Sequence, residues 1–468
     1  MHCYFSFLRI SLLNFIYGMH SPKNKAKIQQ KRLLKIIKYA QKYSPYYQKL
    51  YEGIDLDHVT LCQLPPVTKV QLMNNFDDWV TDRNIKKEEL DAFTSRKENI
   101  GQKFKNKYIV YQTSGSTGAP MTILDDDFTH DVAIGTGSFR NWSGGIKTML
   151  WFYKKHKFAP KASVILPFDI FSISSYDAME FIRHLPKKRR NHTDMIDVST
   201  PIDQIVEKLN NHQPNLVATY PTYMKMLCNY QKNGKLNISP TIVTTIGEKL
   251  TDQIRKDIED TFGAFVCTTY ACTEGASMTH ECKAHHHQHL NDDWIIIEAV
   301  DEAGNPVPHG EMSNKIYLTN LSNFTQPLIR YEITDRVIIR DGKECGCKDE
   351  RLWIDVEGRT PVLLQFTDKN NNPVDISSIS VSMEMHKVGD ETELYQFIVH
   401  DNNEIEIRLK PLDPFNKEDV FQKIKQHIGK YLENNHIVTY HIYLSKEEPL
   451  FDKSGKFKEI FQDPTPKI

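Results

Sequence analysis

The sequence predicts an α/β protein with a large layered N-terminal domain and a small α+β C-terminal domain. The chain has 468 residues, more than one hydrophobic core normally serves. Strand-like and helix-like segments alternate between residues 163 and 263, which is typical of sheets flanked by helices. After residue 292 the segments become β-rich. We expect a large domain over 1–358, ending in a β-rich subdomain, and a separate small C-terminal domain over 359–468.

The N-terminal region is predicted to be helical. The first 18 residues are apolar and aromatic, but Arg9 interrupts them and they lack a small-residue cleavage site. They are too short to span a bilayer comfortably, so we expect a docking helix, with peripheral membrane contact as the alternative. A longer helix from about residue 29 should end before Pro45, because the residue preceding a proline avoids the α region. A turn and another helix are expected over 64–80.

The central and C-terminal elements follow from hydrophobic periodicity. Strands are rich in β-branched residues, and helices repeat apolar residues at helical spacing. The expected central strands are 163–168, 215–220 and 241–247, and the helices between and after them are 203–212, 222–232 and 251–263. The C-terminal domain should combine strands at 394–401, 404–410 and 437–444 with one amphipathic helix at 418–435.

Composition narrows the functional classes. The chain has 59 basic and 60 acidic side chains and a formal net charge of -1, so its overall charge does not suggest a nucleic-acid binder. Eight cysteines without a cleavable signal pattern suit a reducing compartment, and the cytoplasm is the expected location.

Six short motifs carry the chemistry. The first, TSGSTG at 113–118, is a loop of small and hydroxylated residues between two strand-like stretches. A P-loop would end in Gly-Lys-Ser/Thr, whereas Ala119, Pro120 and Met121 follow here. Backbone N–H groups and hydroxyls can nevertheless hold phosphate without a lysine. The other five motifs are IGEKL at 246–250, TTYACTEG at 268–275, LIRYEITD at 328–335, EGR at 357–359 and SGKFKEI at 454–460.

In this order the motifs resemble those of the adenylate-forming superfamily, which activates carboxylic acids as acyl-AMP. The chain is similar in particular to the phenylacetate-CoA ligase branch, including relatives encoded with capsular polysaccharide genes, and residues 34–51 and 64–82 match that branch as well. The resemblance implies ATP-dependent acid activation, release of pyrophosphate and thioester formation with CoA. ATP, Mg2+ and CoA are the implied cofactors, and the partners are small molecules.

The resemblance also assigns phosphate-binding and metal-binding residues. Glu274 would hold Mg2+ and the hydroxyl of Thr273 would meet the phosphate, since a hard cation prefers oxygen ligands. Lys456 would bridge the attacking carboxylate and the α-phosphate and stabilise the developing charge, although Lys453 or Lys458 could be mistaken for it. The loop residues implied to clasp the phosphates are Ser114, Gly115, Ser116, Thr117 and Gly118.

The remaining implied residues belong to the nucleoside and the acid. Tyr270 would stack on adenine and Asp335 would accept the ribose hydroxyls, with Arg359 as its neighbour. The resemblance places Thr360 and Pro361 at the hinge between the large and the small domain. Proline fixes φ and could restrict the swing of the small domain. The residues bordering adenine are Gly247, Glu248 and Ala271, and those lining the acid pocket are Tyr220, Pro221 and Tyr223.

A second, separate metal site is expected from the cysteines. Cys282, Cys345 and Cys347 with one imidazole form a plausible tetrahedral zinc set, and four protein ligands would make the zinc structural. His289 is the preferred fourth ligand, and His287 and His285 are the alternatives.

Three other functions compete with CoA ligation. Acyl transfer to a carrier or polysaccharide acceptor would keep the adenylation step. A non-catalytic relative in polysaccharide biosynthesis would keep only the fold. A zinc-dependent nucleic-acid module is disfavoured by the neutral overall charge. A homodimer is a further expectation.

Overall fold

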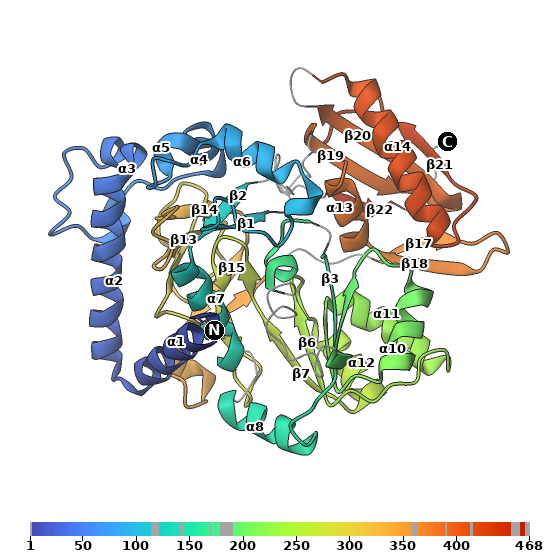
Figure 1. The fold of residues 1–468 in the computed structure, drawn as a ribbon, viewed down its shortest axis with the longest axis horizontal. Coiled ribbons are helices and arrows are strands. Elements are labelled where there is room, and N and C mark those ends of the chain that lie inside the picture. The colour runs from blue at the N-terminus through green and yellow to red at the C-terminus, as the bar shows by residue number, and fades with distance from the viewer. Residues whose placement is uncertain are drawn as a thin grey trace.

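The computed structural model describes residues 2–113, 121–140, 145–168, 170–177, 191–357, 363–388, 391–411, 415–450 and 459–463. Figure 1 shows the N-terminal helices in blue at one side, a green α/β unit in the lower part, and the orange C-terminal part above it. The predicted α/β class is confirmed by this mixture of parallel and antiparallel sheets with helices.

A five-stranded parallel sheet forms the centre of the α/β unit. Its order is β4-β3-β5-β6-β7, formed by Thr193–Asp197, Ala162–Leu166, Leu216–Thr219, Ile242–Ile246 and Phe265–Thr269. The helices after β4, β5 and β6 are α10 (Ile202–His212), α11 (Pro221–Lys232) and α12 (Asp252–Phe262). The predicted central strands and helices are therefore present in the predicted order.

Helix α12 illustrates how the local sequence sets an element. The Thr251 hydroxyl accepts a hydrogen bond from the Ile254 N–H at the N-terminus, and Gly263 ends the helix in the left-handed conformation. Between these caps, Ile254 and Ile258 face the sheet and join its core. Their spacing of four residues is the helical repeat that predicted the element.

The N-terminal part also contains helices that precede the α/β unit in the chain. They are α1 (His2–Met19), α2 (Pro22–Tyr43), α3 (Pro45–Leu50), α4 (Lys69–Asn74), α5 (Phe76–Trp79) and α6 (Lys87–Thr94). The predicted stop before Pro45 is confirmed, because Ser44 is extended and separates α2 from α3. The helix expected within 64–80 is divided into α4 and α5, with a break at Asn75.

An antiparallel hairpin holds the two ends of the predicted phosphate loop. Strands β1 (Ile109–Gln112) and β2 (Thr122–Asp125) pair along their full length. The Thr113 N–H donates to the Met121 carbonyl at 2.9 Å, and the Met121 N–H donates to the Thr113 hydroxyl at 2.9 Å. Helices α7 (Asp127–Arg140) and α8 (Gly145–Lys155) follow.

The β-rich region after residue 270 contains three antiparallel groups. The smallest is the hairpin of β8 (Ala271–Cys272) and β9 (Ala276–Ser277). A four-stranded sheet contains β10 (Thr279–Glu281), β11 (Gln288–Leu290), β16 (Trp353–Val356) and β15 (Val337–Arg340). A three-stranded sheet contains β12 (Ile295–Val300), β13 (Lys315–Asn320) and β14 (Tyr331–Ile333).

The C-terminal residues have a hydrophobic core of their own, which includes Phe397, Ile424 and Leu432. The main sheet has the order β21-β20-β19-β22, beside the hairpin β17-β18. The predicted domain boundary lies at residues outside the described ranges and stays a prediction. The strands are β17 (Leu363–Thr367), β18 (Pro373–Ser377), β19 (Thr392–Val399), β20 (Glu404–Pro411), β21 (His441–Leu444) and β22 (Ile460–Gln462), and the helices are α13 (Ser378–His386) and α14 (Lys417–Asn434).

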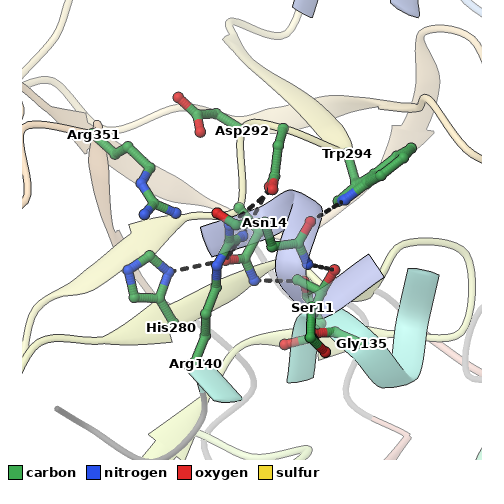
Figure 2. A network of polar contacts seen from close by, with 12 residues as sticks. Ser11, Asn14, Gly135, Arg140, His280, Asp292, Trp294 and Arg351 are labelled. Atoms are coloured by element: carbon green, nitrogen blue, oxygen red, sulfur yellow. Dashed lines mark hydrogen bonds and ion pairs between the residues drawn. The ribbon is translucent and has the colours of Figure 1, made fainter. Parts of the chain in front are cut away.

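A buried polar network joins α1 and α7 to the β-rich region (Figure 2). The Arg140 guanidinium donates to both carboxylate oxygens of Asp293 at 2.8 Å and to the Asn14 carbonyl at 3.3 Å. Burial alone would raise the pKa of Asp293, but the charge of Arg140 outweighs burial and holds this pKa below its usual value. Within the described residues, no helix combines the length and apolar character needed to cross a membrane.

Replacing Arg140 by methionine should destabilise the fold strongly. Arg140→Met leaves the fully buried Asp293 carboxylate without its charge partner, which typically costs about 3–5 kcal/mol. Denaturant unfolding followed by fluorescence measures the loss. The matched control is Arg340→Met, whose ion pair with Asp355 is partly exposed and should contribute about 0–1 kcal/mol. Similar losses in the two variants would contradict the role given to the buried pair.

Candidate active site

Three predicted segments meet at the carboxyl edge of the parallel sheet. Tyr220 follows β5, Gly247 and Glu248 follow β6, and Tyr270 follows β7. The register pairs Thr219 with Thr245 and Ile246 with Thr269, so these segments leave neighbouring strands side by side. Open α/β sheets bind ligands beyond this edge. The fold therefore brings the predicted adenine border and part of the predicted acid pocket together.

Gly247 allows the close approach of Tyr220. Its φ is +81°, and an added Cβ would lie 2.7 Å from Cε1 of the Tyr220 ring. A residue with a side chain would be strained in this conformation and would collide with the ring. The aromatic ring expected in the acid pocket thus rests on the backbone of the predicted adenine border.

Glu248 is turned towards helix α11. Its carboxylate accepts hydrogen bonds from the Thr222 N–H at 3.0 Å and from the Thr222 hydroxyl at 2.8 Å. Burial raises the pKa of Glu248 to about 7, and the two bonds from Thr222 only partly oppose this rise. Glu248 therefore anchors the start of the helix that also contains Pro221 and Tyr223.

Tyr223 faces the C-terminal part of the chain. Its hydroxyl donates to the Val198 carbonyl and lies 2.7 Å from the Ser380 hydroxyl on α13. Nearby, the Thr222 and Ser377 hydroxyls are 3.0 Å apart, and Lys387 Nζ donates to the Ser199 hydroxyl at 3.2 Å. The end of the predicted acid-pocket segment is thus held at the contact with the C-terminal residues.

Tyr270 and Asp335 are in direct contact. The Tyr270 hydroxyl donates to a carboxylate oxygen of Asp335 at 2.7 Å, although the two residues are 65 positions apart. Burial raises the pKa of Tyr270, and the negative charge of Asp335 raises it further, so the hydroxyl keeps its proton. The structure thereby joins the predicted adenine-stacking ring to the predicted ribose carboxylate.

Thr273 and Glu274 lie in the turn between β8 and β9. Burial raises the pKa of the Glu274 carboxyl group. Its Oε1 atom is 3.3 Å from the Tyr331 hydroxyl, and it makes no ion pair with a described residue. Thr273 lines a small cavity of mixed polar and apolar character together with Asp125 and Asn320. The side-chain groups that donate to this carboxylate, Tyr331 and Cys272, are neutral, and a buried carboxylate of this kind fits a hard cation such as Mg2+.

Tyr331 is a site residue that the sequence analysis did not identify. Its hydroxyl lies 3.3 Å from Glu274 Oε1 and 3.3 Å from Sδ of Met121. It therefore connects the predicted magnesium ligand to the end of the phosphate loop. The available signal was its position in LIRYEITD, four residues before Asp335 on the strand β14.

Several predicted residues lie outside the described ranges. The structure nevertheless locates the two flanks of the phosphate loop, because Thr113 and Met121 close the β1-β2 hairpin. The predicted residues whose positions are not described are Ser114, Gly115, Ser116, Thr117, Gly118, Arg359 and Lys456.

The predicted zinc ligands converge on one point. One ligand atom from each of Cys282, His289, Cys345 and Cys347 lies within 4.8 Å of the other three. Gly346, with φ +70°, forms the turn between the last two cysteines. The soft thiolates and single imidazole suit Zn2+ in tetrahedral coordination.

A second contact orients the histidine of this cluster. The Nδ1–H of His289 donates to the Arg351 carbonyl at 2.9 Å, which leaves Nε2 free to face Cys347 Sγ at 3.4 Å. The alternative ligand His287 has Nδ1 at 3.2 Å from Cys345 Sγ, but its ring is stacked on Trp353 with centroids 3.8 Å apart. His289 is accordingly the histidine of the four-residue set.

Comparison with known proteins identifies two curated relatives of the chain. No family model matches the chain. The chain is 24% identical over 418 residues to Protein CapK from Staphylococcus aureus, covering 85% of this chain and 81% of that protein. It is 23% identical over 223 residues to the phenylacetate-coenzyme A ligase of Thermus thermophilus, covering 45% of this chain and 48% of the ligase, about half the length of each.

Solved structures agree with these two relatives. A 2-hydroxyisobutyryl-CoA ligase in complex with 2-HIB-AMP and CoA, in its thioesterification state, matches with a TM-score of 0.58 and 15% identity over 96% of this chain and 91% of that chain. These likenesses confirm the predicted resemblance to the adenylate-forming superfamily. A post-adenylation structure of that ligase with R3-HIB-AMP has a TM-score of 0.53 and 15% identity, covering 95% and 91% of the two chains. Both likenesses show the superfamily fold.

We propose that the protein holds a structural zinc ion at Cys282, His289, Cys345 and Cys347. Elemental analysis of the purified protein should find about one zinc per chain, because four protein ligands leave no open position. Cys345→Ser should lose the metal and lower the thermal unfolding midpoint. Cys62→Ser, at an exposed cysteine, should retain both. A zinc-free wild-type protein with an unchanged midpoint after zinc addition would refute the site.

Proposed function

We propose that the protein activates a carboxylic acid with Mg-ATP and then transfers the acyl group to CoA. The observation that supports this most is the direct hydrogen bond from Tyr270 to Asp335 beside the carboxyl edge of the parallel sheet. An aromatic ring and an acceptor carboxylate at this edge suit an adenine ring and ribose hydroxyls. CoA is the proposed acceptor because two of the similar proteins are named as CoA ligases.

In the first half-reaction, an oxygen of the ionised acid would attack the α-phosphorus of ATP. The bond between the α-phosphorus and the bridging oxygen breaks, and pyrophosphate leaves with that oxygen. The acid needs no general base because it is already ionised, so positioning and charge stabilisation account for the rate. In the second half-reaction the CoA sulfur attacks the acyl carbon, AMP leaves, and the thiol proton passes to solvent.

Individual residues of the chain have separate proposed roles in this reaction. Asp335 would accept hydrogen bonds from the ribose while Tyr270 holds its carboxylate in place. Glu274 would ligate Mg2+, which supplies positive charge to the phosphates, and Tyr331 would orient that carboxylate. Met121 and Thr113 fix the ends of the loop proposed to clasp the phosphates. Tyr220 would border the acid beside Gly247.

Charge for the α-phosphate is proposed to come from the C-terminal domain. Lys456 would contribute it when this domain, proposed to begin at residue 359, closes over the nucleotide. The C-terminal part already contacts the acid-pocket helix, through Ser380 to Tyr223 and Ser377 to Thr222. A movement at this contact would couple the position of the lysine to the acid pocket.

Lys456→Ala should lower acid-dependent exchange of labelled pyrophosphate into ATP by about a hundredfold or more, because one donor to developing charge is worth about 10²–10³ in rate. ATP binding, measured by calorimetry, should change little. Lys446→Ala removes an exposed C-terminal lysine outside the motif and should retain full exchange, and Lys458→Ala tests the neighbouring lysine.

Two results would overturn this assignment. Full exchange in Lys456→Ala with loss in Lys458→Ala would move the role to the second lysine. Wild-type protein, with Mg2+ and zinc supplied, that shows no exchange over a panel of aryl and short acyl acids would exclude the activation reaction. In that case, ATP affinity unchanged by Glu274→Ala would favour a non-catalytic relative.

A further inference from the structure

Between residues 9 and 19, the part of α1 whose side chains are described, the helix buries a narrow stripe and exposes its apolar side. Ile10, Asn14 and Tyr17 are buried at helical spacing. We call the opposite side the apolar face, and its five large side chains are 38% to 66% exposed. The apolar face consists of Leu12, Leu13, Phe15, Ile16 and Met19.

Polar contacts fix this rotation of α1 (Figure 2). The Asn14 side-chain NH2 donates to the Thr136 hydroxyl at 3.1 Å, and the Trp294 indole N–H donates to the Asn14 side-chain oxygen at 2.7 Å. The Ser11 hydroxyl donates to the Gly135 carbonyl at 3.2 Å. Turning the helix to bury the apolar face would leave these groups without their hydrogen-bond partners, and each buried group without a partner costs about 1–3 kcal/mol. Outward exposure of the apolar face is therefore built into the fold.

The charges of the chain segment that contains the apolar face have one sign. Residues 1–51 contain ten basic and no acidic side chains, although the whole chain has a net charge of -1. On α2, directly after the apolar face, an exposed lysine recurs every fourth residue and makes no ion pair with the described residues. This lysine stripe consists of Lys23, Lys27 and Lys31.

We propose that α1 and the start of α2 dock on an anionic lipid bilayer. The apolar face would enter the boundary between headgroups and acyl chains, and the lysine stripe would contact lipid phosphates. A second copy of the chain fits less well, because a two-fold contact on this surface would bring two uncompensated basic segments together. A nucleic acid would pair with the lysines but leave the apolar face in water. The inference is independent of the proposed catalytic function.

Sedimentation with lipid vesicles tests the docking surface. The full-length protein should bind vesicles of phosphatidylcholine with about one third phosphatidylglycerol, and should bind pure phosphatidylcholine much more weakly. Phe15→Ser/Ile16→Ser should weaken binding about tenfold or more, since it removes inserted apolar area. The matched control, Phe415→Ser/Val438→Ser, changes two exposed apolar residues of the C-terminal part and should bind normally.

A second set of variants for the vesicle experiment reverses the charge of the lysine stripe. Lys23→Glu/Lys27→Glu/Lys31→Glu should weaken binding about a hundredfold or more, because each basic residue near an anionic surface contributes about 1 kcal/mol. The control Lys208→Glu/Lys256→Glu/Lys430→Glu makes the same change in net charge at other exposed lysines and should retain binding. Pyrophosphate exchange should be unaffected in every variant.

Four outcomes would overturn the proposal. The first is that wild-type protein does not bind anionic vesicles. The second is that the test and control variants lose vesicle binding equally. The third is that sedimentation velocity shows a dimer that depends on Phe15 while vesicles do not bind. The fourth is retention of DNA or RNA that needs the lysine stripe while vesicles do not bind. The third result would assign the surface to a second copy, and the fourth to nucleic acid.

Discussion

The register between β6 and β7 is the constraint on which the candidate site depends. Because Ile246 is paired with Thr269, the chain leaves the two strands at the same level, with Gly247 beside Tyr270. A slip by one residue would turn the side chains of a strand to the opposite face of the sheet. Buried residues such as Val243 and Val266 on these strands resist such a slip. The packing of the core thus determines the geometry of the proposed adenine site.

The β-rich region supplies the second half of the site. The hydrogen bond from Tyr270 to Asp335 links the parallel sheet to the segment after β14, and Tyr331 on β14 links that strand to Glu274 and Met121. Aromatic hydroxyls therefore make both connections between the acidic groups and the surrounding segments. This arrangement gives both carboxylates neutral hydroxyl donors, and oxygen ligands of this kind suit a nucleotide with a divalent cation.

Local pattern and the order of motifs were enough to predict much of this arrangement. Alternating periodicity predicted the central strands and helices, the motifs singled out Tyr270, Asp335 and Glu274, and the cysteines with a nearby histidine predicted the four-residue cluster. The role of Tyr331 depends on contacts across many residues, which no local pattern contains. The rotation of α1 could not be predicted from the sequence either, because apolar residues occur on most sides of that helix. The buried partners of Asn14 decide which side packs against the rest of the protein.

The phosphorus atom of ATP that the acid attacks distinguishes acyl-adenylate formation most directly from acyl-phosphate formation. The protein would be incubated with Mg-ATP, CoA and carboxylic acids labelled with oxygen-18 in the carboxylate, and the products analysed by mass spectrometry. Acyl-adenylate formation predicts that one labelled oxygen appears in AMP, because the attacking carboxylate oxygen stays on the α-phosphorus when the acyl group leaves. Label recovered in inorganic phosphate, with ADP as the nucleotide product, would instead show an acyl phosphate and contradict the account.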